Sequence, residues 1–249
     1  MTKKLRILCL HGHRTNAKVM ENQAKGLRAA MGETAEFIFL NAPNLAPGPG
    51  DESIARHHAQ DAPFYEWWNV EPVEGKTFSD EWSLIHTNGE KAFEFMDKTL
   101  RAIGPIDVVM GFSQGAVLLT LLSMKYMQLQ NEKWWKLCIC VGGVSVRLAD
   151  HREFFTTPDG RPIRVPFPSI HIIGEQDPFR DEGELLANQY DDFPTLYAAS
   201  PLRKMILYHS GGHKFPSPRS NASMYQDLTR VIHEHCRLVD DDASTRSRL

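Results

Sequence analysis

The sequence has few cysteines, no long hydrophobic run and no strong excess of charge. Its 249 residues include four cysteines, and none of these form a C-x-x-C pair, so a zinc site of that kind has no support. No stretch approaches the ~18 apolar residues of a membrane-spanning helix. The formal net charge of -3 gives no field that would attract nucleic acid or an anionic membrane. We therefore expect no nucleic-acid partner and no membrane span.

The cysteines and the first residues of the chain indicate a reducing compartment. Cys138 and Cys140 lie in the apolar run "LCICVGG", which is typical of small buried hydrophobic side chains. The opening "MTKKLRILCLHGH" is basic, but it lacks the long apolar region and cleavage site of a secretory signal. Because disulfides persist mainly in oxidising compartments, we expect a cytoplasmic protein with free thiols.

Short apolar runs rich in branched residues alternate with helical patterns along the chain. Most of the runs are continuously apolar, which is typical of parallel strands covered on both faces. They predict strands at residues 5–10, 36–40, 107–110, 137–141, 170–173 and 204–208. Apolar residues at helical spacing predict helices over residues 16–31, 83–103, 114–127 and 221–239. This alternation predicts a single α/β domain over residues 1–239, with a mainly parallel central sheet and helices on both faces.

Three stretches interrupt this alternation. Residues 41–81 are rich in Pro and Gly ("NAPNLAPGPGDES") and contain the aromatic run "FYEWWNV". Long loops inside compact domains are usually functional, so we expect this one to lie near the active site. Residues 147–168 form a second irregular stretch. Residues 240–249 are polar, and we expect a disordered tail there.

The stretch "DVVMGFSQGAVLLTLLS" contains the strongest chemical signal in the sequence. Gly111, Ser113 and Gly115 match the nucleophile-elbow pattern G-x-S-x-G, with an apolar strand directly before it and an apolar helix directly after it. A serine hydroxyl needs a base to react at neutral pH, and the start of a helix stabilises a developing oxyanion. The alternative is a glycine-rich turn with an idle serine. We predict that Ser113 is the nucleophile.

Two later loops supply candidates for the acid and the base. Asp177 follows a predicted strand in "SIHIIGEQDPFRDEGELL", and its rival Asp181 is placed to begin the next helix. His213 follows two glycines in "KMILYHSGGHKFPSPRS", and its rival His209 ends the strand itself. The order Ser…Asp…His is that of the nucleophile-elbow enzymes, and ligands gather at the carboxyl ends of strands in open α/β sheets. We predict that Asp177 and His213 complete a triad.

The loop after the first strand, "LCLHGHRTN", is the candidate for the second half of an oxyanion hole. The backbone N–H groups of His13 and Gln114 are the expected pair. The competing interpretation is a metal site through His11 and His13, but no full ligand set at a recognised spacing accompanies them, so we expect no metal. His57, His58 and Asp61 are the further candidate ligands for such a site.

Together these pieces resemble the FSH-type serine hydrolases of the α/β-hydrolase superfamily, to which the ovarian-cancer-associated protein 2 hydrolases belong. The matching residues are "LCLHGHRTN", "YEWW", "GFSQGA", "GEQDP" and "GGHKFP", in the family's order. The resemblance implies the α/β-hydrolase fold, a triad of Ser113, Asp177 and His213, and no cofactor. This chain departs from the pattern at His13, where a bulky aliphatic or aromatic residue is more usual, and in the extended 41–81 segment. Both departures bear on substrate preference.

Three aromatic residues are candidates for substrate contacts: Trp67, Trp68 and Phe112. Pockets for small molecules are largely apolar and aromatic, so the two tryptophans could line an acyl pocket. The alternative is that they pin the long loop to the sheet edge. The sequence does not separate these roles.

The leading functional hypothesis is hydrolysis of carboxylic esters of small or acyl-chain substrates through an acyl-enzyme. The runner-up is a thioesterase for acyl-CoA or carrier-bound acyl chains, which would use the same intermediate. A hypothesis of another class is a non-catalytic ligand-binding protein on the same fold, which a complete triad disfavours. The oligomeric state stays open.

Overall fold

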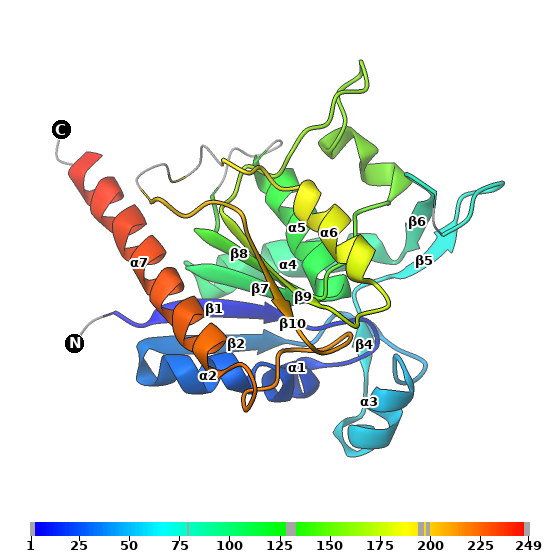
Figure 1. Ribbon diagram of the computed structural model, residues 1–249. Helices are drawn as coiled ribbons and strands as arrows, with labels where there is room; N and C mark the ends of the chain where they lie inside the picture. Colours follow the sequence, from blue (N-terminus) through cyan, green and yellow to red (C-terminus); the bar gives the residue numbers. More distant parts are fainter. Residues whose placement is uncertain (1–2, 79, 128–132, 194–196, 198–199, 247–249) are drawn as a thin grey trace.

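The central sheet has six strands in the order β10-β9-β8-β7-β1-β2 (Figure 1). The computed structural model describes residues 3–78, 80–127, 133–193, 197 and 200–246. All pairings in this sheet are parallel, so the predicted parallel sheet is confirmed. The strands are β1 (Leu5–Leu10), β2 (Ala35–Leu40), β7 (Val108–Phe112), β8 (Leu137–Val141), β9 (Ser169–Gly174) and β10 (Met205–His209).

Burial on both faces explains why the strands read as continuous apolar runs. Successive side chains of a strand point to opposite faces. In β1, Leu8 and Leu10 belong to one hydrophobic core, whereas Ile7 and Cys9 belong to the other. Every residue of β7, β8 and β9 is buried. The sheet therefore has no solvent-facing side at its centre.

Helices cover both faces, as predicted (Figure 1). One core contains side chains of α1 (Ala17–Gln23), α2 (Lys25–Met31) and α7 (Ala222–Arg246). The other contains side chains of α4 (Gly89–Ile103), α5 (Gln114–Lys125) and α6 (Arg180–Asn188). α5 is apolar all round because nearly all of its side chains are buried between the sheet and its neighbours.

Two of the predicted helices are interrupted. The helix expected over residues 16–31 breaks at Ala24 into α1 and α2. Gly26 lies just beyond the break, where a Cβ would come within 2.4 Å of the Tyr225 ring of α7; the close approach of α2 to α7 requires a residue that is a weak helix former. The helix expected over residues 83–103 begins only at Gly89. Before it, β6 (Leu84–Thr87) pairs with β5 (Asn69–Pro72), and Asn88 has a left-handed φ of 63°.

The 41–81 segment, expected as a loop, contains short elements. They are β3 (Asn44–Leu45), α3 (Glu52–His57), β4 (Tyr65–Glu66) and β5, and short 3₁₀ helices lie at Ala59–Asp61 and, further along the chain, at Ala149–Phe154. The antiparallel pair β3 and β4 is separate from the main sheet. These elements are too short to produce a periodic hydrophobic pattern, which is why the sequence predicts none of them.

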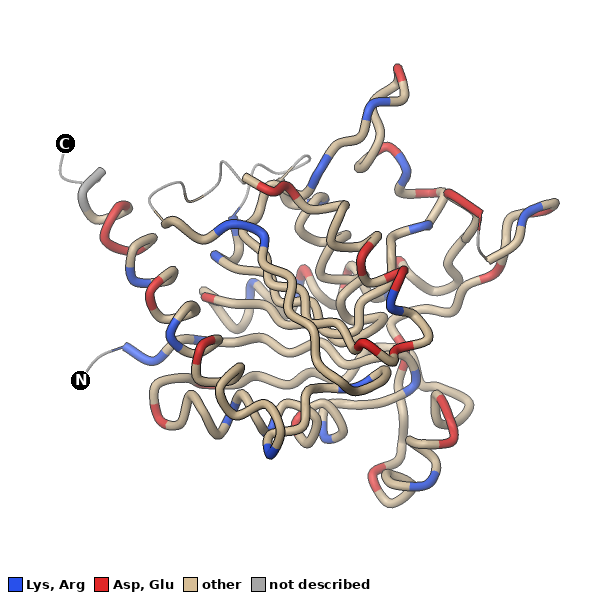
Figure 2. The backbone as a smooth tube through the Cα atoms, viewed as in Figure 1, with Lys and Arg blue, Asp and Glu red and all other residues tan. Residues whose placement is uncertain are grey.

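Residues 240–246, expected to belong to a disordered tail, are part of α7, which continues through Arg246, and residues 247–249 of that expected tail lie outside the described residues. An exposed ion pair one helical turn apart, Arg237 to Asp241 at 2.9 Å, and the ion pair of Lys136 with Asp240 at 2.6 Å support this extension. Lys and Arg alternate with Asp and Glu along α7 (Figure 2). Among the described residues, no helix is long and apolar enough to cross a bilayer.

Candidate active site

The sharp turn between β7 and α5 places Ser113 at the carboxyl end of the sheet. Ser113 has φ 51° and ψ -117°, a conformation that non-glycine residues adopt only under strain. A Cβ on Gly111 would lie 2.3 Å from the Gly115 oxygen, and one on Gly115 would lie 2.2 Å from the Leu10 oxygen. The two glycines of the elbow are therefore required because backbone packs directly against backbone.

A hydrogen-bonded chain links three side chains from three different loops. The Nε2 atom of His213 lies 3.0 Å from the Ser113 hydroxyl oxygen. Its Nδ1 atom lies 2.8 Å from Oδ2 of Asp177. A carboxylate only accepts hydrogen bonds, so Nδ1–H donates to Asp177 and Nε2 is left to accept from the serine hydroxyl. This arrangement can remove a proton from Ser113 as the oxygen attacks.

The structure also places the two rival residues. His209 is buried, and its Nδ1 accepts a hydrogen bond from the Gly211 N–H at 3.1 Å. Asp181 lies in the first turn of α6, as the sequence predicts. Asp177, by contrast, is joined to His213 on one oxygen and accepts the Phe179 N–H on the other at 2.8 Å. Asp177 and His213 are therefore the acid and imidazole that come together at Ser113.

Aromatic rings surround the imidazole of His213. Phe112 packs against it with ring centres 5.1 Å apart, and Phe179 meets it edge-on at 5.2 Å. Phe112 is 5% exposed and also contacts Phe215, so its side chain supports the imidazole from inside. Phe179 is 48% exposed. Sequence reasoning missed Phe179, because a single aromatic residue after Asp-Pro carries no recognisable pattern.

The loop after β1 lies directly beside the elbow. A Cβ on Gly12 would come within 3.4 Å of Cβ of Ser113. The side chain of the next residue, His13, reaches Glu66 at 3.4 Å, and burial lowers the pKa of this imidazole. Arg14 donates to the same carboxylate at 2.7 Å. Glu66 was not singled out from the sequence; it lies next to the tryptophan pair and fastens this loop to β4.

The histidine pair His11 and His13 does not converge on a shared point that a metal could occupy. Both ring nitrogens of His11 contact backbone atoms: Nδ1 lies 2.8 Å from the Gly12 oxygen and Nε2 lies 3.0 Å from the Ala42 nitrogen. His58 and Asp61 form a separate pair at 2.8 Å. Among the described residues, no group of three or more His, Cys, Asp or Glu side chains is arranged to hold a metal ion.

Trp67 and Trp68 are 0% and 2% exposed and belong to the hydrophobic core. The indole N–H of Trp67 donates to the His11 oxygen at 2.9 Å. Trp67 therefore fastens the segment to the end of β1, whereas Trp68 packs against Phe93 of α4 and His86 of β6. Neither side chain has surface free for a substrate.

The Gln114 side chain fixes the same segment, which the sequence did not reveal. Its Oε1 accepts from the Trp67 N–H at 3.2 Å, and its Nε2 donates to the Trp68 oxygen at 2.7 Å. Gln114 also begins α5, whose first N–H groups have no partner within the helix. Gln114 thus joins the start of α5 to Trp67 and Trp68, which directly follow β4.

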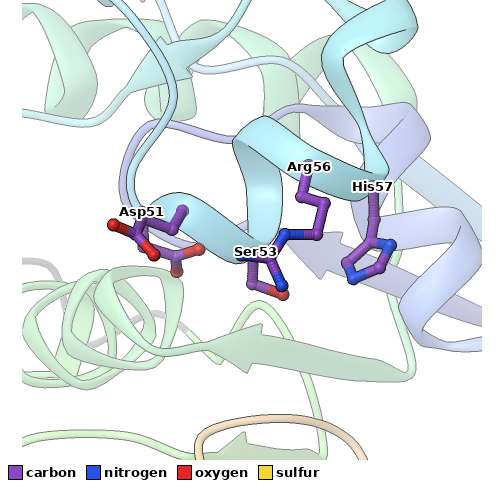
Figure 3. Close-up of a pocket in the computed structure, with 5 residues that line it drawn as sticks. Asp51, Ser53, Arg56 and His57 are labelled. Atoms are coloured by element: carbon purple, nitrogen blue, oxygen red, sulfur yellow. The ribbon is translucent and has the colours of Figure 1, made fainter.

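Two surface hollows lie apart from this hydrogen-bonded chain. One lies along α3, with Asp51, Ser53, Arg56 and His57 among its lining residues (Figure 3). The other, of about 220 Å³, lies between Trp82, Arg147 and Leu185. Neither is lined by Ser113, Asp177 or His213.

The sequence matches the family model described as "Serine hydrolase (FSH1)" over residues 1–225. The chain belongs to the FSH1 serine hydrolase family. It is 26% identical over 234 residues to Esterase OVCA2 of Danio rerio, covering 91% of this chain and 96% of that protein. It is 30% identical over 220 residues to Esterase C25G4.2 of Caenorhabditis elegans, covering 86% and 87%. The resemblance to this family in the sequence motifs is confirmed.

Solved esterase structures share the fold of this FSH1-family enzyme. The crystal structure of esterase PE8 superimposes with a TM-score of 0.56 and 18% identity, covering 92% of this chain and 93% of that one. At this identity the likeness is one of fold. The predicted α/β-hydrolase fold is confirmed.

Proposed function

We propose that this FSH1-family enzyme hydrolyses carboxylic esters of small or acyl-chain substrates through Ser113, His213 and Asp177. The observation that carries the proposal is the continuous hydrogen-bonded chain from the Ser113 hydroxyl through the imidazole to the Asp177 carboxylate. The strained backbone of Ser113 adds support, because strain of this kind clusters at active sites.

In the first half of the reaction, Ser113 Oγ attacks the ester carbonyl carbon while His213 Nε2 takes the hydroxyl proton. Asp177 holds the ring so that Nδ1–H faces its carboxylate, and it stabilises the imidazolium that forms. The tetrahedral intermediate collapses when the imidazolium gives its proton to the leaving alcohol oxygen. The products are a free alcohol and an acyl-Ser113 ester.

In the second half, a water molecule attacks the acyl-Ser113 carbonyl while His213 accepts its proton. Collapse of the second intermediate returns the proton to Ser113 Oγ and releases the carboxylic acid. The backbone N–H groups of Gln114 and His13 donate to the oxyanion in both halves. A thioester would give the same acyl-enzyme, so the leaving group is decided by measurement rather than by the triad.

Intact-mass labelling with a fluorophosphonate tests the proposal. We expect one adduct on the wild type and none on Ser113→Ala, and loss of the nucleophile should lower ester hydrolysis by roughly 10⁴-fold or more. Ser210→Ala is a matched control, because Ser210 is an exposed serine three positions before His213 in the sequence, and this variant should keep the adduct. Folded wild-type protein that gains no adduct would favour the non-catalytic binding protein instead.

A parallel series of p-nitrophenyl esters and acyl-CoA thioesters, each at several chain lengths, then decides the leaving group. A higher kcat/KM for esters at every chain length supports the proposal as stated. A higher kcat/KM for thioesters would favour the thioesterase hypothesis over the proposed ester hydrolysis.

A further inference from the structure

The carbonyl oxygen of Gly12 receives hydrogen bonds from two buried side chains. His11 Nδ1 lies 2.8 Å from it and Thr15 Oγ1 lies 2.9 Å from it. His11 is 0% exposed and Thr15 is 3% exposed. Neither side chain touches the Ser113, His213 and Asp177 chain, so the mechanism described above does not use them. Two buried donors on one loop carbonyl fix the orientation of that peptide group.

The surroundings of His11 determine which of its nitrogens carries the proton. The backbone N–H of Ala42 can only donate, so Nε2 of His11 accepts this bond at 3.0 Å and carries no hydrogen. Burial lowers the pKa of His11 to about 4, which keeps the ring neutral at physiological pH. The single proton is therefore on Nδ1, and it points at the Gly12 oxygen. The Thr15 hydroxyl donates to the same oxygen, and its Oγ1 lies 3.2 Å from His11 Nδ1, so the two donors approach the oxygen side by side.

Fixing this carbonyl also fixes the N–H on the other side of the same peptide bond. The peptide bond between Gly12 and His13 is trans, so its C=O and N–H point in opposite directions. The carbonyl faces the interior side chains of His11 and Thr15. Gly12 lies against the elbow: a Cβ added to it would be 3.4 Å from Cβ of Ser113. Within the part of the chain that the structure describes, the His13 N–H has no hydrogen-bond acceptor.

We propose that His11 and Thr15 are positioning residues that hold the Gly12–His13 peptide with its N–H turned toward the oxyanion formed at Ser113. The inference rests on the proposed ester hydrolysis. Without these two donors the peptide group can rotate, and its carbonyl oxygen would then repel the oxyanion instead of an N–H stabilising it. Such a rotation weakens transition-state binding and leaves binding of the neutral ester unchanged.

Thr15→Val tests the proposal, because valine keeps the shape of threonine and removes the donor. Loss of a whole oxyanion donor costs ~10²–10³ in kcat. Because His11 still holds the carbonyl, we expect about a tenfold lower kcat for Thr15→Val, with KM within about twofold. Affinity for an aryl boronic acid, which forms a tetrahedral adduct with the serine, should fall by the same factor. Thr15→Ser keeps the hydroxyl and should restore both values.

Thr120→Val is the matched control. Thr120 is also fully buried, and its hydroxyl donates to the Ala116 oxygen at 2.8 Å and contacts the Tyr190 hydroxyl, away from the loop after β1. It should lose a similar amount of stability to Thr15→Val and keep the wild-type kcat. Equal losses of kcat in the two variants would mean that the effect comes from packing, and this would overturn the proposal.

His11→Asn separates the Gly12 contact from the contact with Ala42. Its side-chain amide can still donate to the Gly12 oxygen, but it leaves the Ala42 N–H without an acceptor. We expect lower stability with kcat within about threefold of wild type. A kcat as low as that of Thr15→Val would contradict the role assigned to the Gly12 carbonyl.

A crystal structure of Thr15→Val gives a readout that does not depend on activity. We expect the Gly12–His13 peptide to be rotated or present in two orientations. A single unrotated orientation would overturn the proposal, even if the wild type hydrolysed no ester. Inactive, unlabelled wild-type protein would count against the proposed function and not against this orientation.

Discussion

The strand-turn-helix unit around Ser113 and the segment of residues 41–88 are held in place by different interactions. In the first, β7 and α5 are buried almost throughout and rely on regular backbone hydrogen bonds. In the second, short strands are fastened by side chains that bond to distant backbone. Asn16 donates to the Asp61 and Pro63 oxygens, Asn44 donates to the Trp67 oxygen, and Gln114 bonds to Trp67 and Trp68.

The two regions should tolerate different kinds of substitution. The unit around Ser113 has no free space, so a single added carbon meets backbone. The 41–88 segment has space at Gly48 and Gly75, although a Cβ on Gly50 would meet the His13 oxygen at 2.5 Å, and the segment depends on a few polar contacts. Substitutions that add volume should therefore damage the first region, and substitutions that remove one hydrogen-bonding group should damage the second.

The largest effect is expected from Gly115→Ala. The new methyl carbon would lie 2.2 Å from the Leu10 oxygen and 2.8 Å from the His11 oxygen, and both are backbone atoms that cannot move aside easily. We expect a loss of at least about 3 kcal/mol in the free energy of unfolding, measured by urea denaturation. Stability within about 1 kcal/mol of wild type would show that the helix can retreat from β1.

Acid should weaken the attachment of the 41–88 segment, because His11 bonds to Ala42 through its ring and to the Trp67 indole through its carbonyl oxygen. Burial lowers the pKa of folded His11 from its ordinary 6.5 to about 4. The unfolded chain therefore takes up the proton first, so stability is full above pH ~6.5 and is lost as the pH falls toward about 4. Protonation of Nε2 also ends its bond with the Ala42 N–H. We expect His11 alone to cost roughly 2 kcal/mol by pH 4.5.

His171 should also make the free energy of unfolding fall at acid pH. It is fully buried in β9, and burial lowers its pKa to about 3. Denaturation curves at pH 7, 6, 5 and 4.5 should show a steady fall, and His171→Phe should reduce its slope without abolishing it. A flat profile over this range would mean that these histidines are not held neutral in the folded protein.

The parts that the sequence predicts are those governed by burial and by position in the sheet. The strands are predicted to within two residues because both of their faces are buried. Ser113, Asp177 and His213 are predicted because each follows the end of a strand, where a parallel sheet brings loops together. Their hydrogen bonds have the expected connectivity, although their catalytic roles stay predictions.

The parts that the sequence does not predict depend on contacts between residues far apart in the chain. Gln114 bonds to backbone 47 and 46 residues away, and Arg14 pairs with Glu66 across 52 residues. No periodicity records such contacts. Leu84 and Ile85 fit the spacing of the following helix, but pairing with β5 places them in a strand. The same distant contacts explain why Trp67 and Trp68 are in the core.

A smaller effect is expected from Gln114→Met, which removes the amide that holds Trp67 and Trp68 while keeping the length of the side chain. We expect a loss of about 2 kcal/mol in the free energy of unfolding, because two backbone groups lose their partner. Gln189→Met is a matched control, since Gln189 makes the same pair of bonds to the Val146 N–H and oxygen at 2.9 and 3.1 Å. Both variants should lose similar stability.

Only the Gln114 variant should alter the 41–88 segment. Limited proteolysis under native conditions should cleave Gln114→Met faster within residues 41–88 than either Gln189→Met or wild type, and its kcat should fall. Equal cleavage in the two variants would mean that the tryptophans hold the segment without help from Gln114.

The smallest effect is expected from Gly48→Ala in the 41–88 segment. A Cβ at this position meets nothing within 4 Å, and the backbone does not adopt a left-handed φ. Alanine reduces the conformational freedom of the unfolded chain, so we expect the free energy of unfolding to change by less than about 1 kcal/mol, toward greater stability. The same substitution, glycine to alanine, would thus destabilise the protein strongly at residue 115 and slightly stabilise it at residue 48. If Gly48→Ala lowered the free energy of unfolding as much as Gly115→Ala does, the 41–88 segment would be packed as tightly as the strand-turn-helix unit. Added volume, rather than loss of hydrogen bonds, would then be the main cause of damage in both regions.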